Sequence, residues 1–429
     1  MTLTQDLVRL IRTKPVDEPD LRAAALYFLD AAANAVAGRK STPGRVLSDW
    51  AKGAGVDAGR EALYLGGLIH TLETDDLHRA SVVHPGCVVV PAVLALARKT
   101  GAGGRAALIA TLQGFEACCR VGMAVGPAHY KIWHNTATCG PFGSAMAAAC
   151  LLGLDDEQSM HALGNAGTQA AGLWQFLETG AMSKHLHAGR AAEAGVVAAE
   201  LARFGFTGAP AILEGEKGFF AGACPDPDTG AVSRGAGARW QLHETSIKPW
   251  PSCRHTHPVI DAALDIHAQL QGREIETITI DTYQAAVDVC DRPAPQSEYE
   301  AKFSLYHTAA VALTDGEVTF NSFDAEARER LSALRSRVSA RAAEPFISNY
   351  PKSWGARIQV VCKDGSSVSA ERLNCKGDPE MMLDAEEMKA KARVLLAFGG
   401  MDAVASTQLI DGILTMAEDG PMPELFVTE

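Results

Sequence analysis

The sequence predicts a mainly α protein, with a large all-helical domain followed by a smaller α+β domain. Three observations support this prediction. Residues 1–220 read as one helix after another, residues 221–239 are dominated by Pro, Gly, Asp and Ser, and patterns typical of strands begin beyond that segment. A chain of 429 residues is also too long for one ordinary hydrophobic core, so two domains are expected.

The all-helical domain is predicted to span residues 1–240, with C-terminal helices in 400–429 packing back on it. Its helices are rich in Ala and Gly rather than Leu and Phe. Because small side chains let backbones approach closely, we expect tightly packed, almost entirely buried central helices. The first of them starts at Pro19–Asp20 and ends at Gly38. The others are predicted at 61–78, 87–99, 106–125, 140–153, 155–163 and 184–204.

The α+β domain is predicted to span residues 245–398. Its clearest strand signals are 275–283 and a hairpin of 357–363 with 366–373, joined by Asp-Gly. Weaker strands are predicted at 317–320 and 335–341, and helices at 258–270, 301–315 and 324–334. Asp384 with Glu387 forms a capping-box pattern for a last long helix through Phe398, and a final helix is predicted near 401–417.

Composition excludes several classes of protein. The net charge of −12 argues against nucleic acid as a general partner, and an anionic substrate would need a locally basic pocket. The longest apolar run, Cys87–Ala97, falls well short of the ~20 residues that span a bilayer, so no membrane partner is expected. The N-terminus lacks a signal-peptide core, and ten cysteines occur without a C-x-x-C pair. These features predict a reduced, cytoplasmic protein without disulfides.

Residues 70–97, HTLETDDLHRASVVHPGCVVVPAVLALA, hold the densest group of titratable side chains. Asp75 and Asp76 are adjacent, and His84 stands just before Pro85 at the start of an apolar helix. The same stretch contains His70, Glu73 and His78. Acidic residues are rarely buried unless paired, and a helix start can hold an anion. The stretch therefore predicts a charged site at the mouth of the helical core. The alternative is a solvated polar turn in which His84 only replaces an N-cap.

Two other polar segments lie in the first domain. HYKIWHNTATCGPFG places Tyr130 and His134 ahead of a helix, and a surface loop is the alternative. SKHLHAGRAAEAG places Lys184 and His187 three residues apart, on one helix face. In a protein of net charge −12, this basic group is the best candidate for binding carboxylates, and a solvated basic face is the alternative.

The second domain offers two candidate positions. KPWPSCRHTHPVID places His257 just ahead of a helix-opening proline, and KFSLYHTAA places Tyr306 and His307 in an otherwise small, apolar helix. A satisfied core histidine is the alternative for His307. The glycine cluster at 101–104 follows a helix rather than a strand, so it does not predict a dinucleotide site. No ligand spacing demands a metal, and we expect side chains alone to do the chemistry.

These motifs together resemble a known family. ETDDLHRASVVHPGCVVVPAVLALA is similar to the D-F-D-D-T-H…H-P-G…V-P-A-x-L-A-L-A signature of the MmgE/PrpD family, which includes 2-methylcitrate dehydratase, cis-aconitate decarboxylase and iminodisuccinate epimerase. The likeness continues in order through HNTATCGPFGSAMAAACLLGLD, SKHLHAGRAAEAGVVAAELARFGFTG, LEGEKGF, KPWPSCRHTHPVIDAA, EAKFS and GDPEMMLDAEEMKAKA. It covers nearly the whole chain.

The resemblance implies an active site in the cleft between the two domains, a homodimer and no cofactor. Carried onto this sequence, the family's site positions fall on His84, His134, His257, Lys184 and the pair Asp75–Asp76. Two features depart from the pattern. The threonine of D-D-T-H is Leu77 and the earlier Asp is Glu73, while the tyrosine of F-S-x-P-Y is displaced, so that Tyr306 or His307 takes its place.

The family's reactions make or protonate a carbanion next to a carboxylate, which requires a positioned acid or base and a group that stabilises the charge. The resemblance implies a cofactor-independent dehydratase of a hydroxylated di- or tricarboxylate, like 2-methylcitrate dehydratase. Alternatives are an epimerase of an amino- or iminodicarboxylate, a cis-aconitate-type decarboxylase, and an inactive dicarboxylate-binding protein. The expected catalytic residues are His84, Lys184, His134, Asp76 and Tyr130, and the expected substrate contacts are Asp75, His257, Tyr306, His307 and His187.

Overall fold

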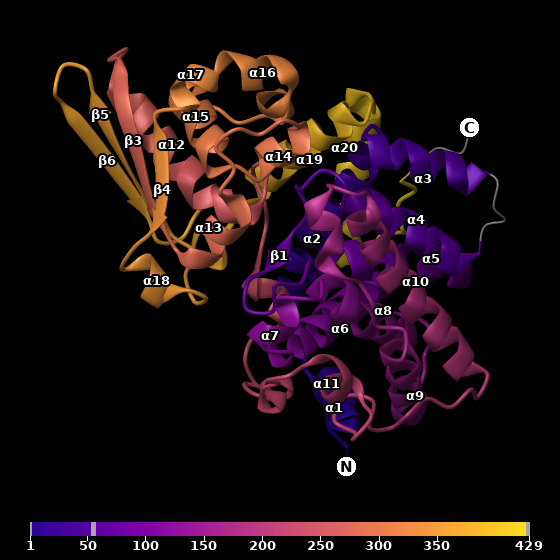
Figure 1. Cartoon of the computed structure of the whole chain (residues 1–429). Helices are drawn as coiled ribbons and strands as arrows, with labels where there is room; N and C mark the ends of the chain where they lie inside the picture. The colour runs from indigo at the N-terminus through magenta and orange to yellow at the C-terminus, as the bar shows by residue number, and fades with distance from the viewer. Residues whose placement is uncertain (1, 53–56, 426–429) are drawn as a thin grey trace. The chain divides into compact units, whose positions relative to one another are not determined.

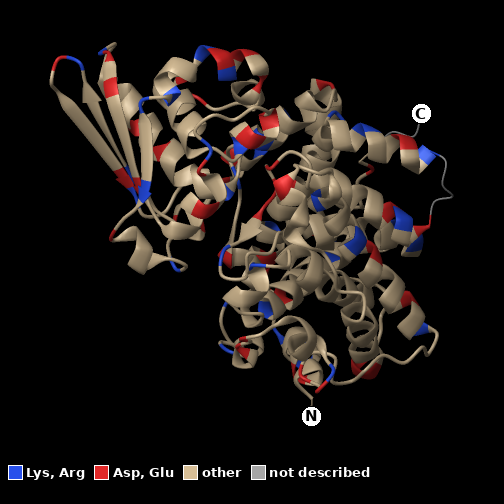
Figure 2. Cartoon of the chain, in the orientation of Figure 1, with Lys and Arg blue, Asp and Glu red and all other residues tan. Residues whose placement is uncertain are grey.

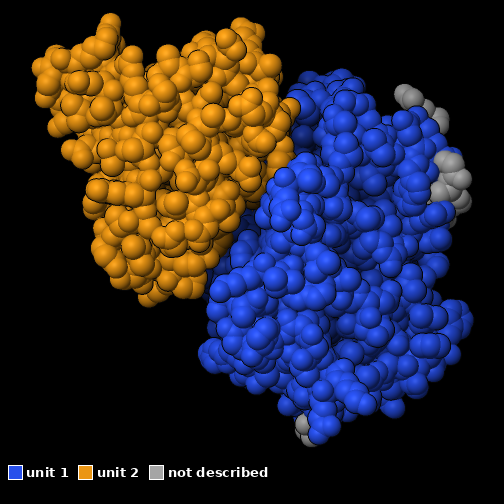
Figure 3. Space-filling model, in the orientation of Figure 1, with its two compact units in different colours: residues 1–246, 384–429 blue, residues 247–383 orange. Residues whose placement is uncertain are grey.

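The computed structural model describes residues 2–52 and 57–425 of the chain (Figure 1). The predicted ranges 1–240 and 400–429 extend into residues that lie outside this description. The chain divides into two compact units, one of residues 1–246 with 384–429 and one of residues 247–383 (Figure 3).

Among the described residues of the first unit, the regular secondary structure is helical apart from two isolated bridges and one two-residue ladder, in which β1 (Leu77–His78) pairs antiparallel with β2 (Thr245–Ser246). Its helices are α1 (Leu3–Thr13), α2 (Glu18–Gly38), α3 (Thr42–Lys52), α4 (Ala58–Ile69), α5 (Gly86–Thr100), α6 (Gly104–Ala124), α7 (Pro127–Tyr130), α8 (Asn135–Leu151), α9 (Asp156–Gly167), α10 (Ser183–Arg203), α11 (Phe219–Ala223), α19 (Ala385–Phe398) and α20 (Ala403–Leu414).

Helices α4, α5, α8 and α10 pack together at the centre of this unit. A Cβ at Gly189 of α10 would overlap the Leu63 carbonyl of α4, and one at Gly195 would overlap Ser144 of α8. The close packing expected from the small residues is therefore confirmed. Helix α8 carries no charged residue, and α5 carries Arg98 and Lys99 only in its last turn (Figure 2). The charged residues of the loop that precedes α5 therefore lie next to an apolar centre.

Several elements of this unit differ from the predicted ones, because tertiary contacts determine their bounds or their partners. The helix predicted over 61–78 ends at Ile69, and the loop that follows leads into β1. Helices α1 and α3 were not predicted. Helix α19 has the expected capping box, but it packs on α2 in the first unit, whereas the predicted boundary placed it in the α+β domain. A cap determines where a helix begins and does not determine what it packs against.

The second unit contains a four-stranded sheet of order β4-β3-β5-β6. Its strands are β3 (Ile275–Thr282), β4 (Val338–Ala342), β5 (Ala356–Cys362) and β6 (Ser367–Arg372). Strand β3 is parallel to β4 and antiparallel to β5, and β5 pairs with β6 in the predicted hairpin. The helices are α12 (His257–Leu270), α13 (Gln284–Cys290), α14 (Glu298–Lys302), α15 (Leu305–Asp315), α16 (Ala325–Arg330), α17 (Ser332–Arg335) and α18 (Phe346–Asn349).

The core of this unit lies between the sheet and helices α12 and α15, where Ile278, Ile280 and Ile358 are completely buried. The strand predicted at 317–320 is wrong: residues Phe320–Phe323 form a 3₁₀ turn, and a two-residue apolar pattern is too short to identify a strand. The helix predicted over 324–334 is divided into α16 and α17.

The fold class is confirmed: the protein is mainly α, with a large helical part and a smaller α+β part. Within residues 2–52 and 57–425, no helix combines the length and the apolar character that crossing a bilayer would need. The segment 221–239 contains the end of the short helix α11 and a 3₁₀ turn at Thr229–Val232, and it packs on α6, where the Arg120 side chain donates to the carbonyls of Val232 and Arg234.

Candidate active site

The loop between α4 and α5 holds three of the ten candidate residues, Asp75, Asp76 and His84. Glu73 and Val82 in this loop have left-handed backbone conformations, with φ of 61° and 52°. Such conformations are unfavourable for residues with a side chain, especially a β-branched one, and persist only where surrounding contacts hold them. Surrounding contacts therefore fix the conformation of this loop, which is not the solvated turn that was the alternative prediction. His78 lies in β1 and hydrogen-bonds with Ser81 and Gln241.

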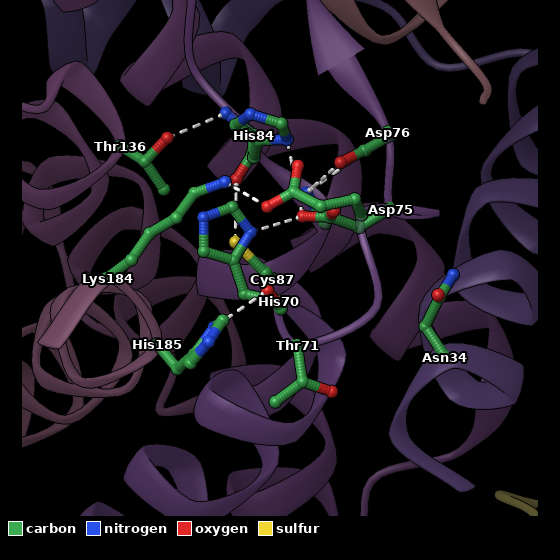
Figure 4. Close-up of polar contacts among 12 residues, drawn as sticks. Asn34, His70, Thr71, Asp75, Asp76, His84, Cys87, Thr136, Lys184 and His185 are labelled. Atoms are coloured by element: carbon green, nitrogen blue, oxygen red, sulfur yellow. Dashed lines mark hydrogen bonds and ion pairs between the residues drawn. The ribbon is translucent and has the colours of Figure 1, made fainter. Parts of the chain in front are cut away.

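Asp75 lies between two histidines of this loop. His70 Nδ1 is 2.6 Å from Asp75 Oδ2, and His84 Nδ1 is 3.3 Å from the same oxygen (Figure 4). Asp75 is only 1% exposed, so its carboxylate faces the two rings rather than solvent. A carboxylate buried against two imidazoles can support the rings, and the substrate-binding role of Asp75 stays a prediction.

Asp76 holds the start of α5. Both of its carboxylate oxygens accept the N–H of Gly86, at 3.0 and 3.1 Å. A Cβ on Gly86 would lie 2.9 Å from Asp76 Oδ2, which explains the glycine. His84 makes no capping hydrogen bond to α5, so the N-cap alternative for His84 is wrong. Burial, and then the nearby Asp75 and Asp30 carboxylates, raise the pKa of Asp76 well above its ordinary value.

Lys184 reaches the loop from α10. Its ammonium group forms an ion pair with Glu73, and the two side chains are 6% and 4% exposed. The basic segment that contains Lys184 is therefore not a solvated helix face at this position. The next residue, His185, bonds through Nδ1 to the His70 carbonyl at 3.0 Å. Lys184 is the cation of this cluster, and its charge is balanced by Glu73.

A layer of rings continues from the loop to the start of α8. His134 lies parallel to His70 with ring centroids 5.6 Å apart, and its Nδ1 is 3.3 Å from His187 Nδ1. Trp174 packs on His134 at 4.7 Å, and Tyr130 meets the edge of Trp174 at 5.3 Å. The structure thus brings His84, His134, Lys184 and His187 into one cluster, with Tyr130 at its margin.

Trp174, His70 and His185 were not assigned to the site from the sequence. Trp174 lies in a 3₁₀ turn whose position depends on tertiary packing, so no periodic signal could have identified it. His70 belongs to the titratable stretch, and its spacing of five residues from Asp75 gave no reason to prefer it over His78.

Burial keeps four histidines, His70, His134, His185 and His187, neutral. Desolvation lowers the pKa of His70 to about 3 and the pKa values of His185 and His187 to about 4, with a further contribution from the Lys184 charge. The pKa of His134 is also lowered well below its ordinary value by burial. At neutral pH these four rings act as neutral hydrogen-bonding groups and proton acceptors.

These lowered pKa values predict a loss of stability in acid. Between pH 6.5 and about 4 the unfolded chain binds more protons than the folded chain, so the free energy of unfolding rises with pH. This contribution is complete above pH 6.5 and decreases as the pH falls. The raised pKa of Asp76 makes the opposite contribution to the dependence of the free energy of unfolding on pH. This contribution comes from one carboxyl group, whereas several histidines contribute in the expected direction. We expect a lower urea midpoint at about pH 5 than at about pH 7.5. An unchanged or higher midpoint in acid would contradict buried, neutral rings.

The predicted residues of the second unit have different surroundings. His257 is completely buried at the start of α12, and its Nε2 donates to the Ser252 carbonyl at 3.2 Å. The Tyr306 hydroxyl, partly exposed, donates to Asp291 at 2.6 Å.

His307 is completely buried within this unit. Its Nε2 donates to the Ser322 carbonyl at 2.8 Å, and its Nδ1 is 3.3 Å from Arg335 Nη1. This is the geometry of a satisfied core histidine, which favours the alternative interpretation, and a site role for His307 stays a prediction. Tyr306 remains the candidate for the displaced tyrosine.

The segment before α12 also buries two cations that were not selected from the sequence. Lys248 is 1% exposed, and Arg254 is 2% exposed and forms an ion pair with Asp378. Lysine and arginine are almost never fully buried unless paired, so nothing local in KPWPSCRHTHPVID could have shown that these two cations are buried.

His70, Asp75 and His84 could supply three ligands to one metal ion, because their ligand atoms all lie within 4.8 Å of one another. However, the 2.6 Å contact between His70 Nδ1 and Asp75 Oδ2 is a direct hydrogen bond, and it occupies two of the atoms that an ion would need. The donor set therefore fits a hydrogen-bonded cluster better than a metal site. The expected absence of a metal stays a prediction.

Comparison with known proteins identifies the family. Models of the MmgE/PrpD N-terminal and C-terminal domains match residues 5–231 and 250–413. The chain is 27% identical to a cis-aconitate decarboxylase of Aspergillus terreus over 333 residues, which cover 70% of this chain and 67% of that protein. It is 29% identical to the Homo sapiens cis-aconitate decarboxylase over 346 residues, with 76% and 70% covered. It is 27% identical to the cis-aconitate decarboxylase-like protein oryM of Aspergillus oryzae over 395 residues, with 85% and 80% covered. Since the two domain models together match well over half of its length, the chain belongs to the MmgE/PrpD family.

Proposed function

We propose that this protein is a lyase that acts on a di- or tricarboxylate by moving a proton at a carbon next to a carboxylate group. The observation that carries the proposal is the buried Asp75 carboxylate between His70 and His84, close to the cation of Lys184. The relatives support the substrate class, since cis-aconitate, the substrate in their names, is a tricarboxylate.

His84 is the proposed proton-transfer residue. Its Nδ1 is buried against Asp75, while 12% of the side chain is exposed, so the ring presents another edge to the site. An imidazole oriented in this way exchanges protons through Nε2. Lys184 is proposed to stabilise the negative charge that develops when a carbanion forms next to a carboxylate. Asp76 is proposed to hold α5, because a carboxyl group that is 2% exposed and bonded to Gly86 does not reach a substrate.

Two reaction types fit this cluster. Decarboxylation of an unsaturated tricarboxylate is supported by the names of the relatives. Dehydration of a hydroxylated di- or tricarboxylate, the reaction expected from the sequence, needs one group to remove a proton and another to protonate the leaving hydroxide. The pair His134–His187, with Nδ1 atoms 3.3 Å apart, supplies a second neutral imidazole group beside His84 and His70. The homodimer and the absence of a cofactor remain predictions.

Proton NMR of the purified protein in deuterium oxide tests the proposal. The substrates are citrate, 2-methylcitrate, cis-aconitate, malate, tartrate, aspartate and iminodisuccinate. New olefinic signals from a hydroxy acid would establish dehydration, and release of carbon dioxide from cis-aconitate would establish decarboxylation. Loss of an α-proton signal without a new product would replace the lyase by an epimerase. If none of these compounds changed, the proposed substrate class would be wrong. The variant His84→Ala, purified in the same way, controls for contaminating enzymes.

A further inference from the structure

His70 is held in one orientation by contacts on several sides. It is the C-cap residue directly after α4, and its side chain is completely buried. The ring meets the edge of His84 with centroids 4.7 Å apart and lies parallel to His134, with an interplanar angle of 18°. Its own carbonyl accepts a hydrogen bond from His185. A ring packed in this way cannot turn without disturbing three neighbouring histidines.

The hydrogen bond of His70 determines where its proton lies. A carboxylate only accepts hydrogen bonds, so at 2.6 Å from Asp75 Oδ2 the Nδ1 atom of His70 must be the donor. Its Nε2 is buried and has no hydrogen-bond partner among the residues that the structure describes. Because burial holds the pKa of His70 at about 3, the ring stays neutral and Nε2 stays unprotonated near neutral pH. His70 is thus a permanent donor to Asp75.

We propose that His70 is a positioning residue for His84, acting through the Asp75 carboxylate that lies between the two rings. The His70 N–H keeps Asp75 in place and favours its ionised form, since a hydrogen bond to a carboxylate stabilises the charge. The oxygen held in this way lies 3.3 Å from His84 Nδ1, and its negative charge favours the tautomer with the proton on Nδ1, which leaves Nε2 to exchange a proton with substrate. This inference rests on the proposed role of His84.

Two substitutions at His70 separate the effect of its hydrogen-bond donor from the effect of its side-chain volume. In His70→Asn the amide nitrogen stands near the position of Nδ1 and can still donate to Asp75, whereas His70→Leu fills the site without a donor. We expect His70→Leu to lower kcat by about 100-fold, at the lower end of what a well-placed proton-transfer group contributes, and His70→Asn to recover most of this loss. KM should change little in both variants, because a completely buried ring does not touch substrate.

The decisive measurement is the tautomer of His84 in the resting protein, from ¹⁵N NMR with labelled histidine. The chain has 13 histidines, and His84→Gln identifies the signal. We expect the proton on Nδ1 in the native protein and in His70→Asn, and a shift of the population toward Nε2 in His70→Leu. An unchanged tautomer in His70→Leu would overturn the proposal, as would equal losses of kcat in the two variants. Since no substrate is needed, this result stands apart from the success or failure of the proposed reaction.

His185→Leu is the matched control. His185 is another buried neutral histidine beside His70, and its Nδ1 bonds the His70 carbonyl rather than the Asp75 carboxylate. We expect it to lower the thermal stability about as much as His70→Leu does, without moving the His84 proton. If His185→Leu shifted the tautomer equally, the effect would come from general loosening of the cluster and the proposal would fail.

Discussion

Replacing His84 by Ala is expected to lower kcat by about 10²- to 10⁴-fold, which is the range for a well-placed general acid or base. The free energy of unfolding should change by only about 1 kcal/mol, a typical value for a single substitution. The reason is that the main-chain N–H of residue 84, which donates to Thr136 Oγ1 at 3.1 Å, remains in the variant. Asp75 also keeps its hydrogen bond from His70.

Turnover and urea unfolding of the same preparation test this expectation. His161→Ala is the control, because His161 is a partly buried histidine of the same unit whose Nδ1 contacts the Gly208 carbonyl at 3.1 Å. This variant should keep the activity of the native protein. A parallel loss of activity and stability in His84→Ala would show that His84 is structural, and the proposed function would lose its proton-transfer residue.

Replacing Lys184 by Met is expected to reduce both activity and stability strongly. Removing one member of a buried ion pair leaves the other charge without its partner, which costs about 3–5 kcal/mol. Here the remaining charge would be the Glu73 carboxylate, whose side chain is 4% exposed. The substitution also removes the cation that is proposed to stabilise negative charge on the substrate.

The double variant Lys184→Met with Glu73→Gln separates the two effects. Because it removes both charges, most of the free energy of unfolding should return, while turnover should stay low. Urea unfolding and kcat measured on the two variants provide the comparison. A double variant as unstable as the single one would show that the ion pair is not the cause, and restored turnover would show that Lys184 is not required for the reaction.

Local signals predicted the helices with strong beginnings and ends. The capping box of Asp384 and Glu387 begins α19 as expected, and the β-branched run at Ile275–Thr282 is strand β3. The hairpin of β5 and β6 follows from its Asp-Gly turn. Each of these signals lies within a few residues of the element that it specifies, so the local sequence is sufficient to predict that element.

Elements whose bounds depend on distant partners were not predicted correctly. The loop after Ile69 has helix-forming residues, yet Asp75, Asp76 and Glu73 make their contacts with His84, Gly86 and Lys184 instead of continuing a helix. A local pattern cannot show that these contacts are stronger than helical hydrogen bonds.

The amino-acid pattern alone predicted the mainly α class, the resemblance to the MmgE/PrpD family and the stretch that contains the candidate site. The role of each charged group could be assigned only from its contacts in the folded chain. The tertiary structure placed Asp75 between His70 and His84, used Asp76 to hold α5, and paired Glu73 with Lys184, which lies 111 residues later in the chain. The physical reason is that the charge and role of an ionisable group depend on its burial and on the charges within a few ångströms. Spacing along the chain specifies neither.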